Sequence, residues 1–308
     1  MEQEHFERAS NDGAASEAEP FRSGYIAICG LPNAGKSTLL NALVGERLAI
    51  ATRKPQTTRR RMLAILSGER HQVVFLDTPG ILEPRYELQG VMMRQVEQSL
   101  ADADLLLYVT DVRQPEVAPG VQQAARGKAL CVALNKADLL PHAEAALPAI
   151  DALHQAVPAA EFHVVSALKN AGIAALREGL VAHMPAGPPY YPPEQLTEHP
   201  ERFFVGELVR ETILERYRQE VPYSAEVVIE EFRERSGAKD YIEALIYVES
   251  ESQKGILIGQ RGQAIRELGQ AARRSIEGFL GRPVFLALRV KVLPNWRRDE
   301  RALRRLGY

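Results

Sequence analysis

Cysteine is scarce in this chain of 308 residues, which contains only Cys29 and Cys131. Each of the two lies in a short apolar run that is typical of a buried strand. Two isolated cysteines exclude a disulfide framework, and we do not expect them to build a metal site.

Long apolar runs are also missing. The longest, such as residues 129–134 and 284–288, end well before the ~18 consecutive apolar residues that a membrane-spanning helix needs. The N-terminus lacks the basic and then apolar pattern of a secretory signal. We therefore expect a soluble, intracellular protein of the cytoplasm.

An excess of charge of one sign is absent from the chain as a whole, whose formal net charge is −2. This balance hides an asymmetry, because residues 261–308 carry 12 Lys and Arg against 4 Asp and Glu, which leaves +8 there and −10 in the first 260 residues. A basic end of this kind predicts contact with a polyanion.

The pattern along the chain is that of two domains, as the length also suggests. Residues 1–20 are polar and acidic, and we expect a mobile, disordered tail. Residues 21–186 alternate strand-like with helix-like segments, which predicts an α/β domain with a doubly wound, mostly parallel sheet. Residues 187–200 form a Pro-rich linker. Residues 201–308 follow the order α-β-β-α-α-β and predict a smaller α+β domain.

The clearest motif is GLPNAGKS at residues 30–37, which fits the phosphate-binding pattern G-x-x-x-x-G-K-S between an expected strand and an expected helix. Gly30 and Gly35 let the backbone curl around phosphates with its N–H groups pointing inward. We expect Lys36 to reach the β- and γ-phosphates and the Ser37 hydroxyl to bind Mg²⁺. The residues assigned to this part of a nucleotide site are Gly30, Leu31, Pro32, Asn33, Ala34, Gly35, Lys36, Ser37 and Thr38.

Residues 77–80, DTPG, end the next apolar run. Asp77 is placed to hold Mg²⁺, and the Gly80 amide is placed to sense the γ-phosphate. Taken alone, this tetrapeptide is equally compatible with a plain turn.

Residues 135–138, NKAD, indicate which base is bound. A carboxylate at Asp138 can accept hydrogen bonds from N1–H and the 2-amino group of guanine, neither of which adenine offers. We expect Asn135 to tie this loop to the phosphate loop and the stem of Lys136 to cover the base. The motif therefore predicts a guanine nucleotide.

Residues 166–168 close a further strand-like run, at a place where a backbone amide can bind guanine O6; they are Ser166, Ala167 and Leu168. The tripeptide is too short to indicate guanine binding by itself. Together, however, the four motifs stand at the C-terminal ends of expected strands, which is where open α/β sheets bind their ligands.

With these motifs the sequence resembles the translation-factor-like GTPases and, more closely, the Era family. The resemblance extends to ATRKPQTTRRR at residues 51–61, which implies the first switch segment, with Thr58 as a Mg²⁺ ligand and Thr57 as the alternative. A basic loop at a strand edge is the simpler interpretation of that segment alone.

The residue after DTPG is Ile81, where Ras-like enzymes carry a glutamine that orients the attacking water. An isoleucine cannot hydrogen-bond a water, so the resemblance implies a potassium ion near Asn33 that supplies positive charge between the phosphates. A loop-shaping role for Asn33 is the alternative. The catalytic residues expected on this basis are Lys36, Asn33, Thr58 and Gly80.

Residues 255–262, GILIGQRG, contain a G-x-x-G loop like that of KH domains, and the element order around it is that of the type II KH arrangement. The two glycines let the backbone approach phosphates, and Arg261 supplies charge. Trp296 is expected to pack the chain end onto the domain, with stacking on a base as the alternative. The residues expected to bind RNA are Gly255, Ile258, Gly259, Gln260, Arg261, Gly262, Arg273, Arg274 and Lys291.

An Era-like GTPase domain joined to a KH domain implies a Mg²⁺-dependent, potassium-stimulated GTPase switch. The resemblance further implies binding to the 3′ end of 16S ribosomal RNA, assistance in maturation of the 30S subunit, and peripheral association with the cytoplasmic face of the inner membrane. We also expect a monomer. Three alternatives stay open: an RNA chaperone with an inactive nucleotide fold, a GTPase of tRNA modification, and a P-loop metabolic kinase, which NKAD disfavours.

Overall fold

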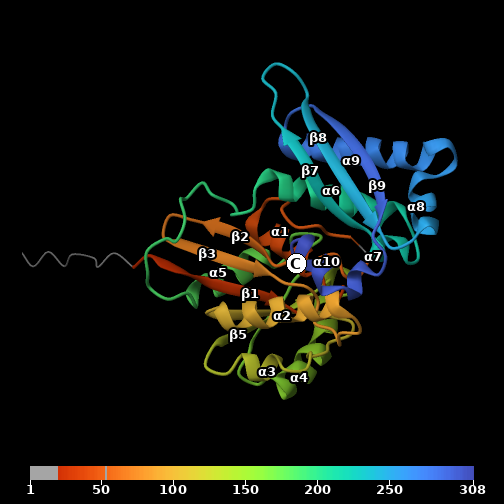
Figure 1. Ribbon diagram of the computed structural model, residues 1–308. Helices are drawn as coiled ribbons and strands as arrows, with labels where there is room; N and C mark the ends of the chain where they lie inside the picture. Colours follow the sequence, from red (N-terminus) through yellow and green to blue (C-terminus); the bar gives the residue numbers. More distant parts are fainter. Residues whose placement is uncertain (1–19, 53) are drawn as a thin grey trace, which may run out of the picture.

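Two sheets organise the part of the chain that the computed structural model describes, residues 20–52 and 54–308 (Figure 1). The tail expected at residues 1–20 lies outside the described residues except for Pro20, and so does Arg53 of the expected switch segment. Mixed α/β architecture with two domains is confirmed.

The larger sheet has six strands in the order β2-β3-β1-β4-β5-β6. All of its pairings are parallel except the one between β2 and β3, so the expected doubly wound sheet is present. Its strands read as near-continuous apolar runs because helices cover both faces. Their bounds are β1 Arg22–Cys29, β2 Met62–Ser67, β3 His71–Asp77, β4 Leu105–Asp111, β5 Ala129–Asn135 and β6 Glu161–Val164.

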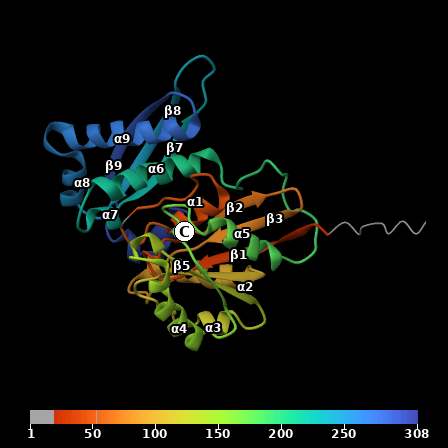
Figure 2. The same cartoon turned by 180° about the vertical axis from the view of Figure 1, so that it is seen from behind.

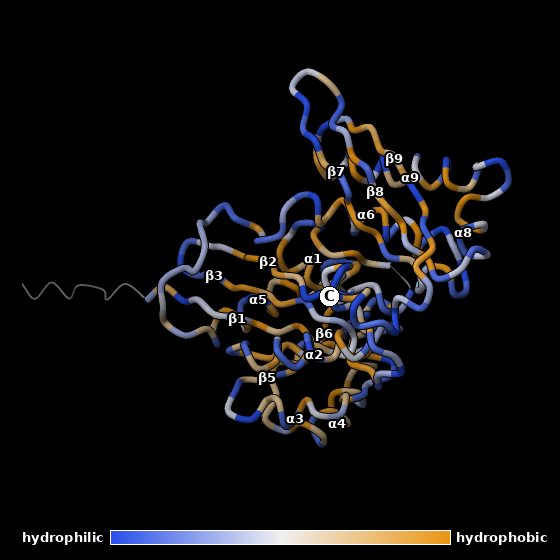
Figure 3. The backbone as a smooth tube through the Cα atoms, in the orientation of Figure 1, coloured by the Kyte–Doolittle hydropathy of each residue, from blue (hydrophilic) through white to orange (hydrophobic). Residues whose placement is uncertain are grey.

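Helices α1 and α5 cover one face of this sheet, and α2, α3 and α4 cover the other (Figures 1 and 2). Leu39 of α1 and Leu176 of α5 belong to one core cluster, whereas Tyr108 and Leu153 belong to the cluster on the opposite face. Figure 3 shows the hydrophobic residues concentrated along the strands and the hydrophilic ones in the loops. The helices are α1 Lys36–Val44, α2 Glu87–Asp102, α3 Val121–Ala124, α4 Leu147–Ala156 and α5 Ile173–Ala182, with short 3₁₀ turns η1 Ala137–Leu139 and η2 Ala143–Ala146.

The Pro-rich linker follows the free edge of β2. The amide of Ile65 donates to the carbonyl of Leu196 (2.8 Å), and the Thr197 hydroxyl donates to the carbonyl of Leu63 (2.6 Å). Further along the linker, the amides of Tyr190 and Tyr191 donate to the Gln72 side chain. These contacts fix the path of the linker on the first domain.

The smaller sheet has the order β7-β8-β9, with β8 antiparallel to β7 and parallel to β9. Helices α6, α8 and α9 pack on one of its faces around Val209, Leu257 and Ile276. The observed order is the expected one, with a short additional helix after α6. The elements are α6 Glu201–Arg216, α7 Val221–Ser224, β7 Glu226–Arg233, β8 Asp240–Val248, α8 Glu251–Ile258, η3 Gln260–Gly262, α9 Gln263–Leu280, β9 Val284–Val292, η4 Trp296–Arg298 and α10 Glu300–Arg305.

The C-terminal end returns to the first domain and lies at the junction of the two (Figure 1). Leu303 and Leu306 of this end share an apolar cluster with Leu88 and Met92 of α2. Trp296 is fully buried in that cluster, and its indole N–H donates to the carbonyl of Ser224 (2.9 Å). Packing, rather than stacking on a base, is therefore the role of Trp296.

Candidate nucleotide and RNA sites

A cavity of about 550 Å³ lies at the carboxyl ends of the parallel strands. The phosphate loop, the segment before β2, and the loops after β3, β5 and β6 all line it, so the structure brings the predicted motifs together at one sheet edge. Lining residues from the predicted set are Pro32, Asn33, Gly35, Lys36, Ser37, Thr38, Thr57, Thr58, Gly80, Asn135, Lys136, Asp138, Ala167 and Leu168.

The phosphate loop owes its shape to its two glycines. Gly30 and Gly35 have φ of +147° and +95°, and a Cβ at Gly35 would lie 2.3 Å from Asn135 Nδ2. Asn33 also has positive φ, at +64°, and is an exposed residue in the lining of the cavity. The curled backbone directs the start of α1 at the cavity, which makes this edge suited to an anion.

Lys36 is buried and lies across its own loop. Its Nζ donates to the carbonyls of Gly30 (3.1 Å) and Leu31 (3.0 Å). Burial lowers the pKa of Lys36, and the nearby Asp77 carboxylate opposes that shift. The ammonium group is therefore held within a few ångströms of the loop backbone that is predicted to surround phosphates.

Three oxygen-bearing side chains converge beside the phosphate loop. The Ser37 hydroxyl lies 3.0 Å from Asp77 Oδ2 and 2.9 Å from the Thr58 hydroxyl, which itself lies 3.3 Å from the same carboxylate oxygen. The structure thus brings Thr58, rather than its alternative Thr57, to the hydroxyl of Ser37.

These groups fit a hard divalent cation. Oxygen donors are the ligands that Mg²⁺ prefers, and Asp77 Oδ1 is buried without a hydrogen-bond partner among the described residues. Burial raises the pKa of Asp77 to about 6, while Lys36 and the two hydroxyls act in the opposite direction. A bound cation would favour the ionised carboxylate further.

Gly80 lets the DTPG segment lie directly against the phosphate loop. A Cβ at this position would come within 2.9 Å of the backbone of Pro32. The next amide, that of Ile81, donates to the carbonyl of Gly30 (3.0 Å). The segment after β3 is therefore fixed at the edge of the cavity, with Gly80 in its lining.

The other end of the cavity carries the groups predicted for guanine. Asn135 joins the loops as expected, because its Nδ2 donates to the carbonyl of Ala34 (3.0 Å) and its Oδ1 accepts from the amide of Ala167 (3.0 Å). Ser166 Oγ donates to Asp138 Oδ1 (2.5 Å), which orients that carboxylate. Leu168 is 73% exposed at the rim.

Arg113 is a residue of this cavity that the motifs missed. Its guanidinium donates to Asp111, which also accepts from Lys136 Nζ (3.0 Å). The two cations hold the pKa of Asp111 well below its usual range, although burial acts to raise it. A signal was available, since Asp111 ends β4 at the same sheet edge as the four motifs.

In the smaller domain, the G-x-x-G loop forms a tight turn between α8 and α9. Gly259, Arg261 and Gly262 all have positive φ, at +70°, +49° and +75°. A Cβ at Gly259 would lie 2.6 Å from the Cβ of Ala264, so this turn requires glycine there. Gln260 and Arg261 are exposed at its tip, whereas Gly255 and Ile258 lie in the preceding helix α8.

A groove of about 380 Å³ runs from this turn between α9 and β9. It combines basic and polar groups with apolar ones, as a surface for single-stranded RNA does. Of the predicted residues it includes Gly262 and Arg273; the others in its lining include Ile265, Arg266, Gln270, Leu286 and Leu288. Arg266 and Gln270 were identifiable, because they lie four and eight residues after Gly262, on one side of a helix.

Two residues predicted to bind RNA lie away from that groove. Arg274 is next to Arg273 in sequence, but the helix turns it toward a different cavity, formed with the linker and α6. Lys291 lies on β9, where Leu286 and Leu288 face the helices, so alternation places it on the open face of the sheet. It pairs there with Glu230 (3.9 Å).

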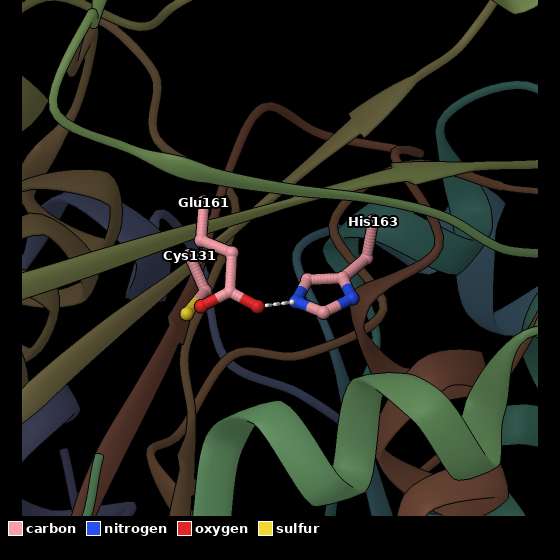
Figure 4. A group of neighbouring side chains, drawn as sticks. All are labelled: Cys131, Glu161 and His163. Carbon is pink, nitrogen blue, oxygen red and sulfur yellow. Dashed lines mark ion pairs between the residues drawn. The ribbon is translucent and has the colours of Figure 1, made fainter. Parts of the chain in front are cut away.

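One further group of ligand-type side chains lies on the first domain, where no metal site was expected. Cys131 of β5 and Glu161 and His163 of β6 bring their donor atoms within 4.8 Å of one another (Figure 4). Glu161 pairs with His163 (2.9 Å) and with His183 (3.6 Å), which accounts for the grouping without an ion. Burial, with Glu161, raises the pKa of the Cys131 thiol to about 12, which disfavours the thiolate that binds metals.

Within residues 20–52 and 54–308, every helix is too short or too polar to cross a bilayer. Both cysteines are buried and free.

Comparison with known proteins identifies the same two parts. The family described as 50S ribosome-binding GTPase matches residues 25–136, and the KH domain family matches residues 220–297. A GTPase Era from Carboxydothermus hydrogenoformans is 42% identical over 294 residues, which span 94% of this chain and 98% of that protein. A chloroplastic ERA-like GTPase from Arabidopsis thaliana is 40% identical over 93% of this chain and 69% of its own length.

Two solved structures match the whole arrangement of both domains. Each has a TM-score of 0.88 and 38% identity, and each match covers 94% of this chain and 99% of the other. One is a variant of Aquifex aeolicus Era bound to GDP and AlF4⁻, and the other is Era in complex with MgGDPNP and nucleotides 1506–1542 of 16S ribosomal RNA.

Proposed function

Because this chain belongs to the Era family of GTPases, we propose that it is a Mg²⁺-dependent, potassium-stimulated GTPase switch that binds the 3′ end of 16S ribosomal RNA and assists maturation of the 30S subunit. Residues 21–186 serve as the GTPase domain, residues 187–200 as the linker and residues 201–308 as the KH domain. The observation that carries the proposal is the convergence of Ser37, Thr58 and Asp77 beside Lys36, in a cavity whose far end holds Asp138.

In this proposal the chain's own groups bind and orient GTP. The phosphate-loop amides and Lys36 hold the β- and γ-phosphates, and the Gly80 amide donates to the γ-phosphate. Asp138 accepts from the guanine edge, with Ser166 fixing its carboxylate and Asn135 fixing the loop. A guanine nucleotide is thereby bound at both ends.

Ser37, Thr58 and Asp77 would hold Mg²⁺, which supplies positive charge to the phosphate oxygens when bound. Asn33 would hold K⁺, which replaces the charge of an arginine finger. Ile81 cannot orient a water, so hydrolysis depends on charge and position rather than on a side-chain base.

The RNA part of the proposal is supported by the groove between α9 and β9 and by the 38%-identical Era structure that contains nucleotides 1506–1542 of 16S ribosomal RNA. Arg266 and Arg273 supply charge for phosphates, and the apolar side chains of β9 supply surface for unstacked bases. We further propose that the protein works as a cytoplasmic monomer. Peripheral contact with the inner membrane would use its basic C-terminal end.

The test is GTP hydrolysis by the full chain in KCl and in NaCl, with and without a single-stranded RNA copying the 3′ end of 16S ribosomal RNA. We expect turnover that requires Mg²⁺, rises in KCl and responds to this RNA. Asn33→Ala should lose the response to potassium while retaining GDP binding. RNA binding without turnover would instead indicate an RNA chaperone with an inactive nucleotide fold.

A further inference from the structure

The segment that carries Thr58 is attached to the second domain on both sides of this threonine. Before it, the carbonyl of Thr57 accepts a hydrogen bond from the Arg210 guanidinium of α6. After it, the Arg59 guanidinium bonds the Glu226 carboxylate (2.8 Å) of β7. Arg59 also donates to three carbonyls around α7, those of Pro222 (3.3 Å), Tyr223 (2.9 Å) and Ala225 (2.7 Å).

These anchors are buried. The side chains of Arg59, Glu226 and Arg210 are 4%, 3% and 1% exposed. Ion pairs at such sites are weakly screened by salt, and Arg59 uses its planar fork to bind a carboxylate and backbone carbonyls together. Arg210 is held in turn by Glu207 one helical turn earlier. The attachment is therefore stiff rather than a loose surface contact.

Glu226 is the centre of the attachment. Besides Arg59, its carboxylate accepts from the Arg60 guanidinium (3.1 Å) and from the Tyr308 hydroxyl (2.7 Å). The guanidinium of Arg60 also donates to the carbonyl of Leu306 (2.6 Å). One carboxylate on the smaller domain thus connects the expected switch segment with the C-terminal end of the chain.

Attachment of Thr57 and Arg59 also restrains Thr58. Consecutive Cα atoms are only ~3.8 Å apart, so fixing both neighbours limits the positions open to the residue between them. In this position the Thr58 hydroxyl meets Ser37 (2.9 Å) and Asp77 (3.3 Å). A group held in this way needs less ordering when the cation and the γ-phosphate bind.

We propose that Arg59, Arg210 and Glu226 are positioning residues for GTP hydrolysis, which hold the Thr58 hydroxyl at the Mg²⁺ site by attaching both of its neighbours to the KH domain. This inference rests on the proposed function, in which Thr58 is a ligand of Mg²⁺. None of the three side chains lines the nucleotide cavity, so they act through the segment that carries Thr58. The KH domain is then part of the GTP-binding machinery.

Comparing the affinities for a GTP analogue and for GDP distinguishes this positioning role from a general structural role. Switch segments are ordered by the γ-phosphate and its Mg²⁺ and are released after hydrolysis. Loss of the attachment should therefore weaken binding of a non-hydrolysable GTP analogue and leave GDP binding nearly unchanged. A folding defect would weaken both.

The experiment compares full-length wild type, Thr58→Ala and Glu226→Gln for affinity toward the GTP analogue and GDP, as a function of Mg²⁺ concentration. For Glu226→Gln we expect roughly tenfold weaker analogue binding, within the usual range of coupling between sites, a higher Mg²⁺ requirement and unchanged GDP affinity. In the double variant, Glu226→Gln should add nothing to Thr58→Ala, because both act through one hydroxyl.

Glu243→Gln is the matched control, since Glu243 is a mostly buried carboxylate in the same sheet that pairs with Arg289 (2.7 Å) away from Thr58. It should leave both affinities unchanged. Arg59→Lys keeps the positive charge but removes the planar guanidinium that bonds several acceptors at once. We therefore expect an intermediate loss of analogue affinity, which tests the inference even if Glu226→Gln does not fold.

Two results overturn the inference. If Thr58→Ala weakens analogue binding but Glu226→Gln and Arg59→Lys do not, the attachment does not position the threonine. If the variants weaken GDP as strongly as the analogue, the role is structural only. If Thr58→Ala itself leaves the preference between the two nucleotides unchanged, the assigned role of Thr58 is wrong and the proposed function must be revised first.

Discussion

The guanidinium of Arg60 lies over the ring of Tyr308, 4.5 Å from its centroid. Arg60, two positions after Thr58, therefore contacts Tyr308 at the C-terminal end. Stacking of this kind stabilises by about 0.5–2 kcal/mol, depending on burial. The contact connects the segment that lines the nucleotide cavity with the C-terminal residues that follow the KH match at 220–297.

The Tyr308 hydroxyl should contribute to stability. Tyr308→Phe keeps the ring but removes the hydrogen bond to Glu226 (2.7 Å), and bonds to charged acceptors contribute about 1.5–3 kcal/mol. We expect the free energy of unfolding, measured by urea titration, to fall by an amount in that range, with a lower urea midpoint. Tyr190→Phe, at a 49% exposed ring, serves as the control and should not change it. Equal midpoints for wild type and Tyr308→Phe would show that this bond contributes nothing.

Guanine recognition should depend on Ser166 as well as on Asp138. Asp138→Asn should move the preference from GTP toward xanthosine triphosphate, because the new amide can donate where the carboxylate accepted. Ser166→Ala removes the hydrogen bond that orients Asp138 and should weaken GDP binding by about fivefold to tenfold, which corresponds to roughly 1 kcal/mol. Nucleotide titrations measure both effects. An unchanged GDP affinity in Ser166→Ala would contradict this positioning role.

Two neighbouring arginines of α9 should behave differently toward RNA. Arg273 lines the groove and Arg274 lines the cavity beside the linker. Arg273→Glu should weaken binding of a single-stranded RNA and reduce its salt dependence, by about one unit of slope for each phosphate that the protein no longer neutralises. Arg274→Glu makes the same change of charge one residue away and should have much less effect. Equal reductions in affinity would mean that general charge, not the groove, binds the RNA.

His199 should make the protein less stable in acid. Its Nε2 accepts from the amide of Leu63 (3.4 Å), which requires the neutral ring, and burial lowers its pKa. The unfolded chain, with an ordinary pKa of ~6.5, then binds the proton more readily, so stability is present above that pH and falls as the pH drops toward the folded-state pKa. His199 faces Glu198, Glu207 and Arg60, of which only the arginine adds to the shift.

The measurement is the urea midpoint at pH 7.5 and 5.5. The decrease on acidification should be smaller in His199→Gln than in wild type, because glutamine accepts the same amide without titrating in this range. His142→Gln changes an exposed histidine and should retain the full decrease. The prediction fails if wild type and His199→Gln lose stability in parallel.

Local sequence was sufficient for the phosphate loop, DTPG, NKAD and the G-x-x-G turn, because each shape depends on residues within one turn or loop. Gly35 illustrates this, since its φ of +95° requires glycine. The order of the strands in both domains also followed from the periodicity of apolar residues, whereas helices α3, α4 and α7 were not predicted.

What the sequence did not reveal depends on pairing between distant segments. Lys291 was predicted to bind RNA, but its parallel pairing with Tyr247 sets which side chains of β9 face outward and places it away from the groove. Likewise, the sequence showed Arg59 only as one basic residue of the expected switch segment, or of a basic loop at a strand edge. Its burial against Glu226, 167 positions later, shows its function in the fold. Periodicity contains no information on such contacts.

The path of the linker also has a consequence for solubility during folding. As the outermost strand, β2 would offer unpaired amides and carbonyls to another chain, which is a common start of aggregation. The linker occupies these groups, through Leu196 at Ile65 and through Thr197 and His199 at Leu63. Its five prolines between residues 187 and 200 lack amide donors, so the linker cannot offer a further strand the regular series of backbone hydrogen bonds that sheet pairing needs. The connection between the two domains therefore also ends the sheet.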